Sequence, residues 1–149
     1  MKESFDIPAR SFDFKKDLEF GLQSEKEIEK FLDDLSNGSF EVKTDRYRNG
    51  RMVIETDQNP RGITDSDGKR IWHKSGINVT TAKWWVYVFS PSQGFVVVDV
   101  SRVKRYLRAN QDIFNESTKI NLGGNDNPAR GFLLMKENVQ DLLTNEIYD

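Results

Sequence analysis

Two short segments joined by a turn signal constrain the fold more than any other part of this sequence. Residues 40–45 and 51–57 alternate or run apolar as strands do, and Asn49-Gly50 between them is a pair typical of hairpin turns. We therefore expect a β-hairpin that carries Asp45 at the end of its first strand and Glu55 near the end of its second. Carboxylates gathered at a sheet end supply the hard oxygen ligands that Mg²⁺ requires.

The geometry of this hairpin decides whether the two acids can meet. A simple two-residue turn would place Asp45 opposite Ile54, on the other face from Glu55. We therefore expect an odd-length loop or a bulge, with Gly50 in a left-handed conformation, which brings both carboxylates to one face. Alternation along the first strand also places Glu41, Lys43 and Asp45 on one face, so that an ammonium group lies beside Asp45.

Composition removes several other classes of protein. The chain has 149 residues with 36% hydrophobic content, enough for one compact domain with a core. It has no cysteine, which excludes disulfides, thiolate zinc sites and cysteine nucleophiles. Its single histidine, His73, leaves little material for a serine–histidine triad. No apolar run reaches the roughly 20 residues that span a bilayer, and the N-terminus lacks a signal-peptide pattern, so we expect an intracellular, cytoplasmic protein.

The remaining elements follow from periodicity and turn chemistry. Residues 1–20 are expected to form an irregular arm, followed by a helix that starts at a capping box of Ser24 and Glu27 and stops at Asn37-Gly38. Residues 58–81 form a long loop or a ragged hairpin. The later elements are a buried hairpin of strands 84–89 and 95–98, a helix over 100–107, a strand over 132–135 and a helix over 137–146.

This order of elements, α-β-β-β-β-α-β-α, with an acid on the first helix and acids ending two strands, resembles the PD-(D/E)XK nuclease superfamily. The similarity is greatest to its compact phage-type and Holliday-junction-resolvase-like members and covers about residues 18–110. It implies an α/β restriction-endonuclease-like fold, in which helices flank a central mixed β-sheet. It also implies a single domain, with a core over 21–110 and a C-terminal extension over 111–149.

The resemblance also implies a set of site residues. Glu25 best matches the helix acid, Asp45 the first strand acid and Glu55 the second, so these three become the expected ligands of Mg²⁺, with Mn²⁺ able to substitute. Family members commonly carry a lysine two residues after the last acid, where this chain has Asp57. Lys43 is the expected replacement for that lysine. A second alignment treats Glu41-Val42-Lys43 itself as the acid-x-lysine motif and makes Glu55 an auxiliary ligand.

Charge is distributed unevenly along the chain despite a net charge of −2. Residues 1–36 hold ten acids against six bases, whereas residues 100–108 hold four bases and no acid. A basic zone of this kind attracts a phosphate backbone, although such charges also simply solvate a surface. The residues expected to contact nucleic acid are Arg46, Arg48, Lys74, Lys83, Arg102 and Arg105.

Three functions remain open from the sequence. The leading hypothesis is a metal-dependent nuclease that hydrolyses DNA phosphodiester bonds. The resemblance to junction-cutting and phage-type members further implies a homodimer and a phage origin. The absent lysine after Glu55 favours an alternative, a catalytically inactive nuclease-fold module that binds DNA or protein. A small regulatory protein whose basic zone meets an acidic partner is the third.

Overall fold

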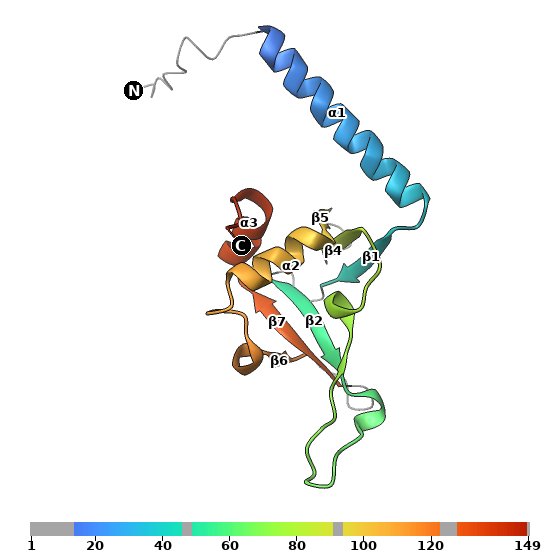
Figure 1. The fold of residues 1–149 in the computed structure, drawn as a ribbon, viewed down its shortest axis with the longest axis vertical. Coiled ribbons are helices and arrows are strands. Elements are labelled where there is room, and N and C mark those ends of the chain that lie inside the picture. The colour runs from blue at the N-terminus through green and yellow to red at the C-terminus, as the bar shows by residue number, and fades with distance from the viewer. Residues whose placement is uncertain (1–13, 46–48, 91–93, 123–127, 149) are drawn as a thin grey trace. The chain divides into compact units, whose positions relative to one another are not determined.

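The computed structural model describes residues 14–45, 49–90, 94–122 and 128–148. The chain divides into two compact units, residues 1–38 and residues 39–149. The described part of the first unit is the helix α1, Phe14–Ser36 (Figure 1). The expected start at Ser24 and the irregular conformation expected for residues 14–20 are therefore wrong. Leu, Lys, Glu and Gln predominate before Ser24, and these residues extend a helix at little cost once it has nucleated.

The second unit contains two sheets and two longer helices (Figure 1). One sheet has three strands in the order β1-β4-β5, and the other has four in the order β3-β2-β7-β6. The mixed α/β class is confirmed, although the strands form two sheets where a single central sheet was expected. In chain order the elements are β1 Phe40–Thr44, β2 Met52–Gln58, η2 Pro60–Gly62, β3 His73–Lys74, η3 Gly76–Asn78, β4 Trp84–Ser90, β5 Gly94–Asp99, α2 Val100–Ala109, η4 Glu116–Thr118, β6 Ile120–Asn121, β7 Ala129–Leu134 and α3 Lys136–Thr144.

The expected hairpin between residues 40–45 and 51–57 is wrong. Strand β1 pairs in parallel with β4, from Phe40 opposite Trp84 to Thr44 opposite Val88, and β2 pairs antiparallel with β3 and β7. Gly50 does take the left-handed conformation expected of it, with a φ of 72°. Its turn, however, redirects the chain into a different sheet. The non-local pairing prevails because β4 is apolar on both faces and gains more burial as a central strand.

The second expected hairpin is confirmed. Strands β4 and β5 pair antiparallel, with Trp85 opposite Val98 and Val86 opposite Val97. The helix expected directly after it is also present as α2, which begins with Asp99 accepting a hydrogen bond from the backbone N–H of Ser101. Strand β5 ends at Asp99 and α2 begins at the next residue. The boundary follows from the sequence, because the apolar residues recur every second position before it and every third or fourth position after it.

The C-terminal elements match their expected positions closely. Strand β7 includes the expected residues 132–134 but starts earlier, at Ala129, and α3 covers most of the expected 137–146. The stretch 58–81 holds η2, β3 and η3, and a bridge between Thr64 and Arg70 makes its outer part a short irregular hairpin. Among the described residues, no helix combines the length and the apolar character needed to cross a membrane.

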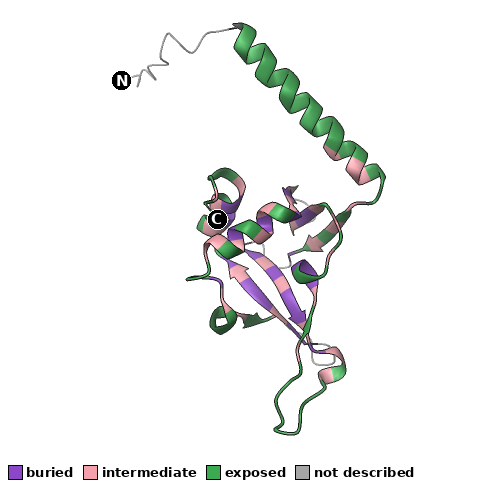
Figure 2. Ribbon diagram, viewed as in Figure 1, coloured by how far each residue is buried: buried purple, intermediate pink, exposed green. Residues whose placement is uncertain are grey.

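Both sheets of the second unit pack around one hydrophobic core. Met52 and Ile54 enter it from β2, Trp85 from β4 and Val98 from β5, while α2 contributes Val103. Figure 2 shows buried residues along β2 and β7. Of the paired tryptophans, Trp85 lies in the core with no exposed area, as the alternation of the strand predicts for one of the two.

Candidate active site

The face of β1 that carries Glu41, Lys43 and Asp45 is the first component of the candidate site. Its neighbours on β4 are Trp85, opposite Glu41, and Tyr87, opposite Lys43. Lys43 Nζ lies 3.0 Å from Glu41 Oε1, and both side chains are half-buried. The ammonium also lies 5.6 Å from the centre of the Trp85 ring. The strand therefore presents the acid-x-lysine pair side by side, as the alternation of its residues predicts.

Glu41 is held in its charged form by two partners. Burial raises the pKa of this carboxyl, but hydrogen bonds from Thr80 and Lys43, with the Lys43 charge, outweigh that effect and leave the pKa lowered. Thr80 belongs to the segment after η3, and its own N–H donates to the carbonyl of Gly76. Glu41 is thus connected to η3 through a single side chain.

Asp45 continues the pairing of β1, because its N–H donates to the carbonyl of Val88 at 2.7 Å. The residue is buried and lies close enough to Tyr87 to affect its hydroxyl. Burial chiefly raises the pKa of Tyr87, a hydrogen bond from Val53 lowers it, and the Asp45 charge raises it further. The Tyr87 hydroxyl accepts that hydrogen bond from the Val53 N–H at 3.2 Å, so Asp45 is linked through Tyr87 to β2.

A cavity of about 500 Å³ opens beside Asp45. Its walls come from the start of β2, from β6 and β7, and from the residues that precede β2. The lining residues are Asp45, Asn49, Arg51, Val53, Ile120, Asn121, Leu122 and Leu133. The cavity is therefore lined on one side by Asp45, which follows β1, and on the other by the face of the second sheet that bears Val53.

Glu55 lies two residues beyond Val53 on β2 and is half-buried. Alternation directs its side chain to the same face as Val53, about 7 Å farther along the strand. Two glycines allow other chain segments to approach the backbone of β2 at Ile54 and Glu55. A Cβ on Gly76 would lie 2.2 Å from the Glu55 carbonyl oxygen, and a Cβ on Gly131 would lie 2.0 Å from the Ile54 carbonyl oxygen. Gly76 also has a φ of 52°, which favours glycine.

Two connections therefore link β1 to β2, one on each side of Lys43. At one end Asp45 reaches Val53 through Tyr87, and at the other Glu41 reaches the Glu55 backbone through Thr80 and Gly76. Strands β1 and β2 are thus connected indirectly, through Tyr87 of β4 at one end and through Thr80 and Gly76 at the other. We call the region between these two connections the β1–β2 seam.

Asp57, two residues after Glu55 on β2, belongs to a network of charged side chains. Its Oδ2 lies 2.7 Å from Lys119 Nζ and 3.1 Å from Arg130 Nε, and accepts from the Thr56 hydroxyl at 2.8 Å. Glu116 binds the same two cations, at 2.9 Å from Lys119 and 2.7 Å from Arg130. Burial raises the pKa of Asp57, but these partners, chiefly Lys119, leave the pKa lowered. The four charges form a network that ties β2 to the segments around η4 and β7.

The remaining expected ligand, Glu25, is an exposed residue of α1 in the first unit. Its role as the third acid stays a prediction. The network around Asp57 was not found from the sequence, because Lys119 and Arg130 are far from Asp57 in the chain and no local pattern marks them.

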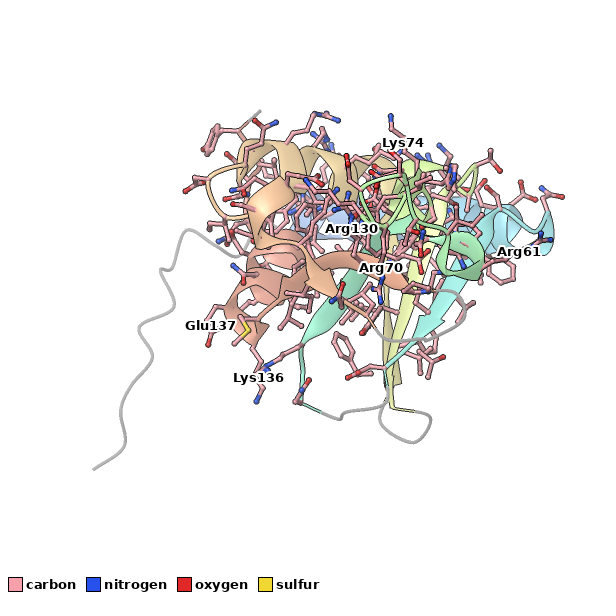
Figure 3. The ribbon with its side chains drawn as sticks, turned by 90° about the horizontal axis from the view of Figure 1, so that it is seen from below. Arg61, Arg70, Lys74, Arg130, Lys136 and Glu137 are labelled. Atoms are coloured by element: carbon pink, nitrogen blue, oxygen red, sulfur yellow. The ribbon has the colours of Figure 1, made fainter. Side chains whose placement is uncertain are left out.

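The residues expected to bind nucleic acid have different environments. Lys74 is exposed on β3 and projects outward in Figure 3, and Arg105 is exposed on α2. Lys83 is paired with Asp99 at 2.5 Å. Arg102 donates to the carbonyls of Leu142 and Asn145, at the C-terminal end of α3. Two further expected residues, Arg46 and Arg48, lie outside the described residues.

Within the described residues, no three side chains of His, Cys, Asp or Glu come together to form a metal-binding group. The chain matches no protein-family model, no curated protein sequence and no solved structure.

Proposed function

We propose that this protein is a metal-dependent nuclease whose reaction centre lies at the β1–β2 seam. One observation carries the proposal. Asp45 shares a cavity with Val53, Glu55 follows Val53 on the same face of β2, and the Lys43–Glu41 pair lies on the face of β1 that carries Asp45. Two acids from separate strands with an ammonium group nearby are the elements that metal-assisted phosphodiester hydrolysis needs.

The chemistry of the two proposed donors suits Mg²⁺. Asp45 and Glu55 offer carboxylate oxygens, and Mg²⁺ in phosphoryl-transfer sites is usually bound by one or two carboxylates together with water and substrate phosphate. Mn²⁺, which also prefers oxygen ligands, is expected to substitute. When bound, such an ion polarises the phosphate and stabilises the charge that develops on its oxygens.

Lys43 has the clearest task among the chain's own residues. Its contact with Glu41 at 3.0 Å fixes the ammonium on the face that it shares with Asp45. From there it can donate a hydrogen bond to the attacking water and offset negative charge on the phosphate. This arrangement supports Lys43 as the replacement for the lysine that is absent after Glu55, in both alignments of the motif.

A test combines conservative substitutions with a cleavage assay. We expect Asp45→Asn and Glu55→Gln each to slow cleavage of supercoiled, branched or single-stranded DNA by about a hundredfold or more in Mg²⁺ or Mn²⁺. Each variant keeps the shape of its side chain, so DNA binding is retained. Asp112→Asn, an exposed acid remote from β1 and β2 in sequence, is the matched control and should cut as the wild type does.

Cleavage that survives in a cleanly purified Asp45→Asn/Glu55→Gln double variant would reject this assignment. A second outcome selects a different function. If the wild type binds DNA but does not cut it in either metal, the protein is a binding module of nuclease type. That alternative is favoured by Asp57, which holds a charge network at the position of the family lysine.

A further inference from the structure

The helix α1 is exposed along almost its whole length (Figure 2). Of residues 15–36, all but Phe31, Asp34 and Leu35 are exposed. With 23 residues the helix is about 35 Å long. A helix in a protein gains most of its stability from the packing of an apolar face rather than from its intrinsic propensity. We therefore expect a second surface to cover α1.

The apolar side chains of α1 follow one narrow stripe. Positions 18, 21, 25, 28, 32 and 35 are separated alternately by three and four residues, which is the spacing of a coiled-coil seam. Leucine or isoleucine occupies four of these six positions, and Leu22 adjoins the stripe beside Gly21. Leu18, Ile28 and Leu32 keep 53%, 56% and 56% of their area exposed. The stripe therefore predicts that the covering surface is another helix, because this repeat keeps a seam facing a neighbouring helix.

The two ends of α1 differ in charge. The first turn carries Lys15 and Lys16 beside a single acid, whereas the last turn carries Asp33 and Asp34 and no base. Bases at the start of a helix and acids at its end both oppose the macrodipole, so this arrangement is unfavourable for one helix by itself. It suits an antiparallel pair of α1 helices, because each basic end then lies beside the acidic end of the other copy. A parallel pair would bring like charges together.

The stripe also fits an antiparallel register. With Leu18 opposite Leu35 of the other copy, Gly21 lies opposite Leu32 and Glu25 opposite Ile28. A Cβ added to Gly21 would meet no atom within 4 Å, so this position is open to receive a leucine side chain. Glu25 is the one charged residue at the six stripe positions. A single polar residue in a seam fixes the register of a coiled coil at a cost in stability.

We propose that α1 pairs with α1 of a second copy of this chain, as an antiparallel two-stranded coiled coil. A second copy is favoured over an unrelated partner because α1 supplies both the stripe and the complementary charges that its own pairing needs. Such an interface is isologous, since the same patch serves both copies. The inference does not depend on the proposed nuclease activity, and its test measures no cleavage.

Sedimentation equilibrium of the full chain over a wide range of concentrations tests the pairing. We expect the wild type to form a dimer that dissociates on dilution. Ile28→Glu/Leu32→Glu places charges in the stripe while keeping good helix formers, and should raise the dissociation constant at least about a hundredfold. The matched control is Gln23→Glu/Lys30→Gln, which makes the same change in net charge at exposed positions on the opposite side of α1. The control should dimerise as the wild type does.

Charge reversal tests the antiparallel orientation. Lys15→Glu/Lys16→Glu brings acids together at both ends of the pair and should weaken the dimer about tenfold at low salt. Adding Asp33→Lys/Asp34→Lys to the same chain restores opposite charges at each end and should restore the wild-type dissociation constant. Thermal unfolding followed by tryptophan fluorescence shows that each variant is folded, because all three tryptophans lie in the second unit.

A wild type that stays monomeric at every concentration would overturn the proposal. A dimer that Ile28→Glu/Leu32→Glu leaves intact, or that the control variant disrupts equally, would overturn it as well. If Lys15→Glu/Lys16→Glu weakens the dimer and the combined variant does not recover it, the antiparallel pairing is wrong.

Discussion

The carboxylate of Asp57 is the centre of a partly buried charge network with Lys119 and Arg130. Its Oδ2 lies within 3.1 Å of both Lys119 and Arg130, and its side chain is only 10% exposed. Removing one partner of a buried ion pair is costly, because the remaining charges keep their burial and lose their compensation. Asp57 is therefore a structural residue of the second sheet.

We expect Asp57→Asn to lower the free energy of unfolding by about 3 kcal/mol at neutral pH. The folded-state pKa of Asp57 is lowered, so its contribution is complete above its unfolded pKa and is lost as pH falls through the folded value. The difference between wild type and variant should thus be constant above about pH 5 and shrink below about pH 4. Urea unfolding at a series of pH values measures it.

Glu116→Gln provides the comparison for this prediction. Glu116 binds the same cations, but its side chain is 68% exposed, so its loss should cost no more than about 1 kcal/mol. Equal losses for the two variants would contradict the assignment of Asp57 as the central member of the network.

At the scale of the element, the segment from Asn59 to Lys74 shows how a long connection is kept ordered. Asn59 is completely buried, and its side-chain amide donates to the carbonyls of Ile63 and Ile71, both at 2.7 Å. These two bonds close the base of the irregular hairpin around Thr64 and Arg70. Arg61 and Arg70 are both exposed on this segment, and Figure 3 labels them. One buried side chain thus reinforces the backbone pairing of this hairpin, in which the Ile71 N–H donates to the Ile63 carbonyl and the Asp65 N–H to the Lys69 carbonyl.

We expect Asn59→Ala to leave the Ile71 carbonyl without this donor and the Ile63 carbonyl with its bond from the Ile71 N–H alone, and to destabilise the closed form of this segment by about 2 kcal/mol. Limited proteolysis should then cut between residues 60 and 72 faster than in the wild type, while the rest of the chain keeps its resistance. Gln140→Ala, which removes an exposed amide on α3, should not change the cleavage rate. An unaltered rate for Asn59→Ala would show that the hairpin closes without this side chain.

The whole second unit depends on a core that both sheets share. Met52 and Ile54 come from one sheet and Trp85 and Val98 from the other, and all four belong to the same buried cluster. Neither sheet can bury its apolar face without the other, because a sheet of three or four short strands needs a covering layer. The two sheets are therefore expected to unfold together.

Met52→Ala tests this cooperativity. Met52 has no exposed area, so its truncation should cost about 2 to 5 kcal/mol. Native-state hydrogen exchange should show the same loss of protection in β4, which belongs to the other sheet, as in β7. Amides of β4 that keep their full protection would indicate two independent folding units.

The positions of the helices and strands were more predictable from the sequence than the pairing of the strands. The hairpin of β4 and β5 and the helix α2 follow from local spacing, as does the left-handed turn at Gly50. The pairing of β1 with β4 does not, since it depends on which distant strand gains most from burial. The contact between Lys43 and Glu41 was predictable from alternation on one strand. The routes through Tyr87 and Thr80 required the tertiary structure.

The parallel pairing of β1 with β4 also has a consequence for the time order of folding. Thr44 finds its neighbour at Val88, 44 residues later in the chain. A ribosome that adds about 5–20 residues per second exposes β1 for roughly 2 to 9 seconds before β4 has been synthesised. Throughout that interval the backbone N–H and C=O groups of β1 lack their partner strand. Pairing of β1 must therefore wait until β4 has been synthesised, and the turn at Gly50 does not supply a partner earlier.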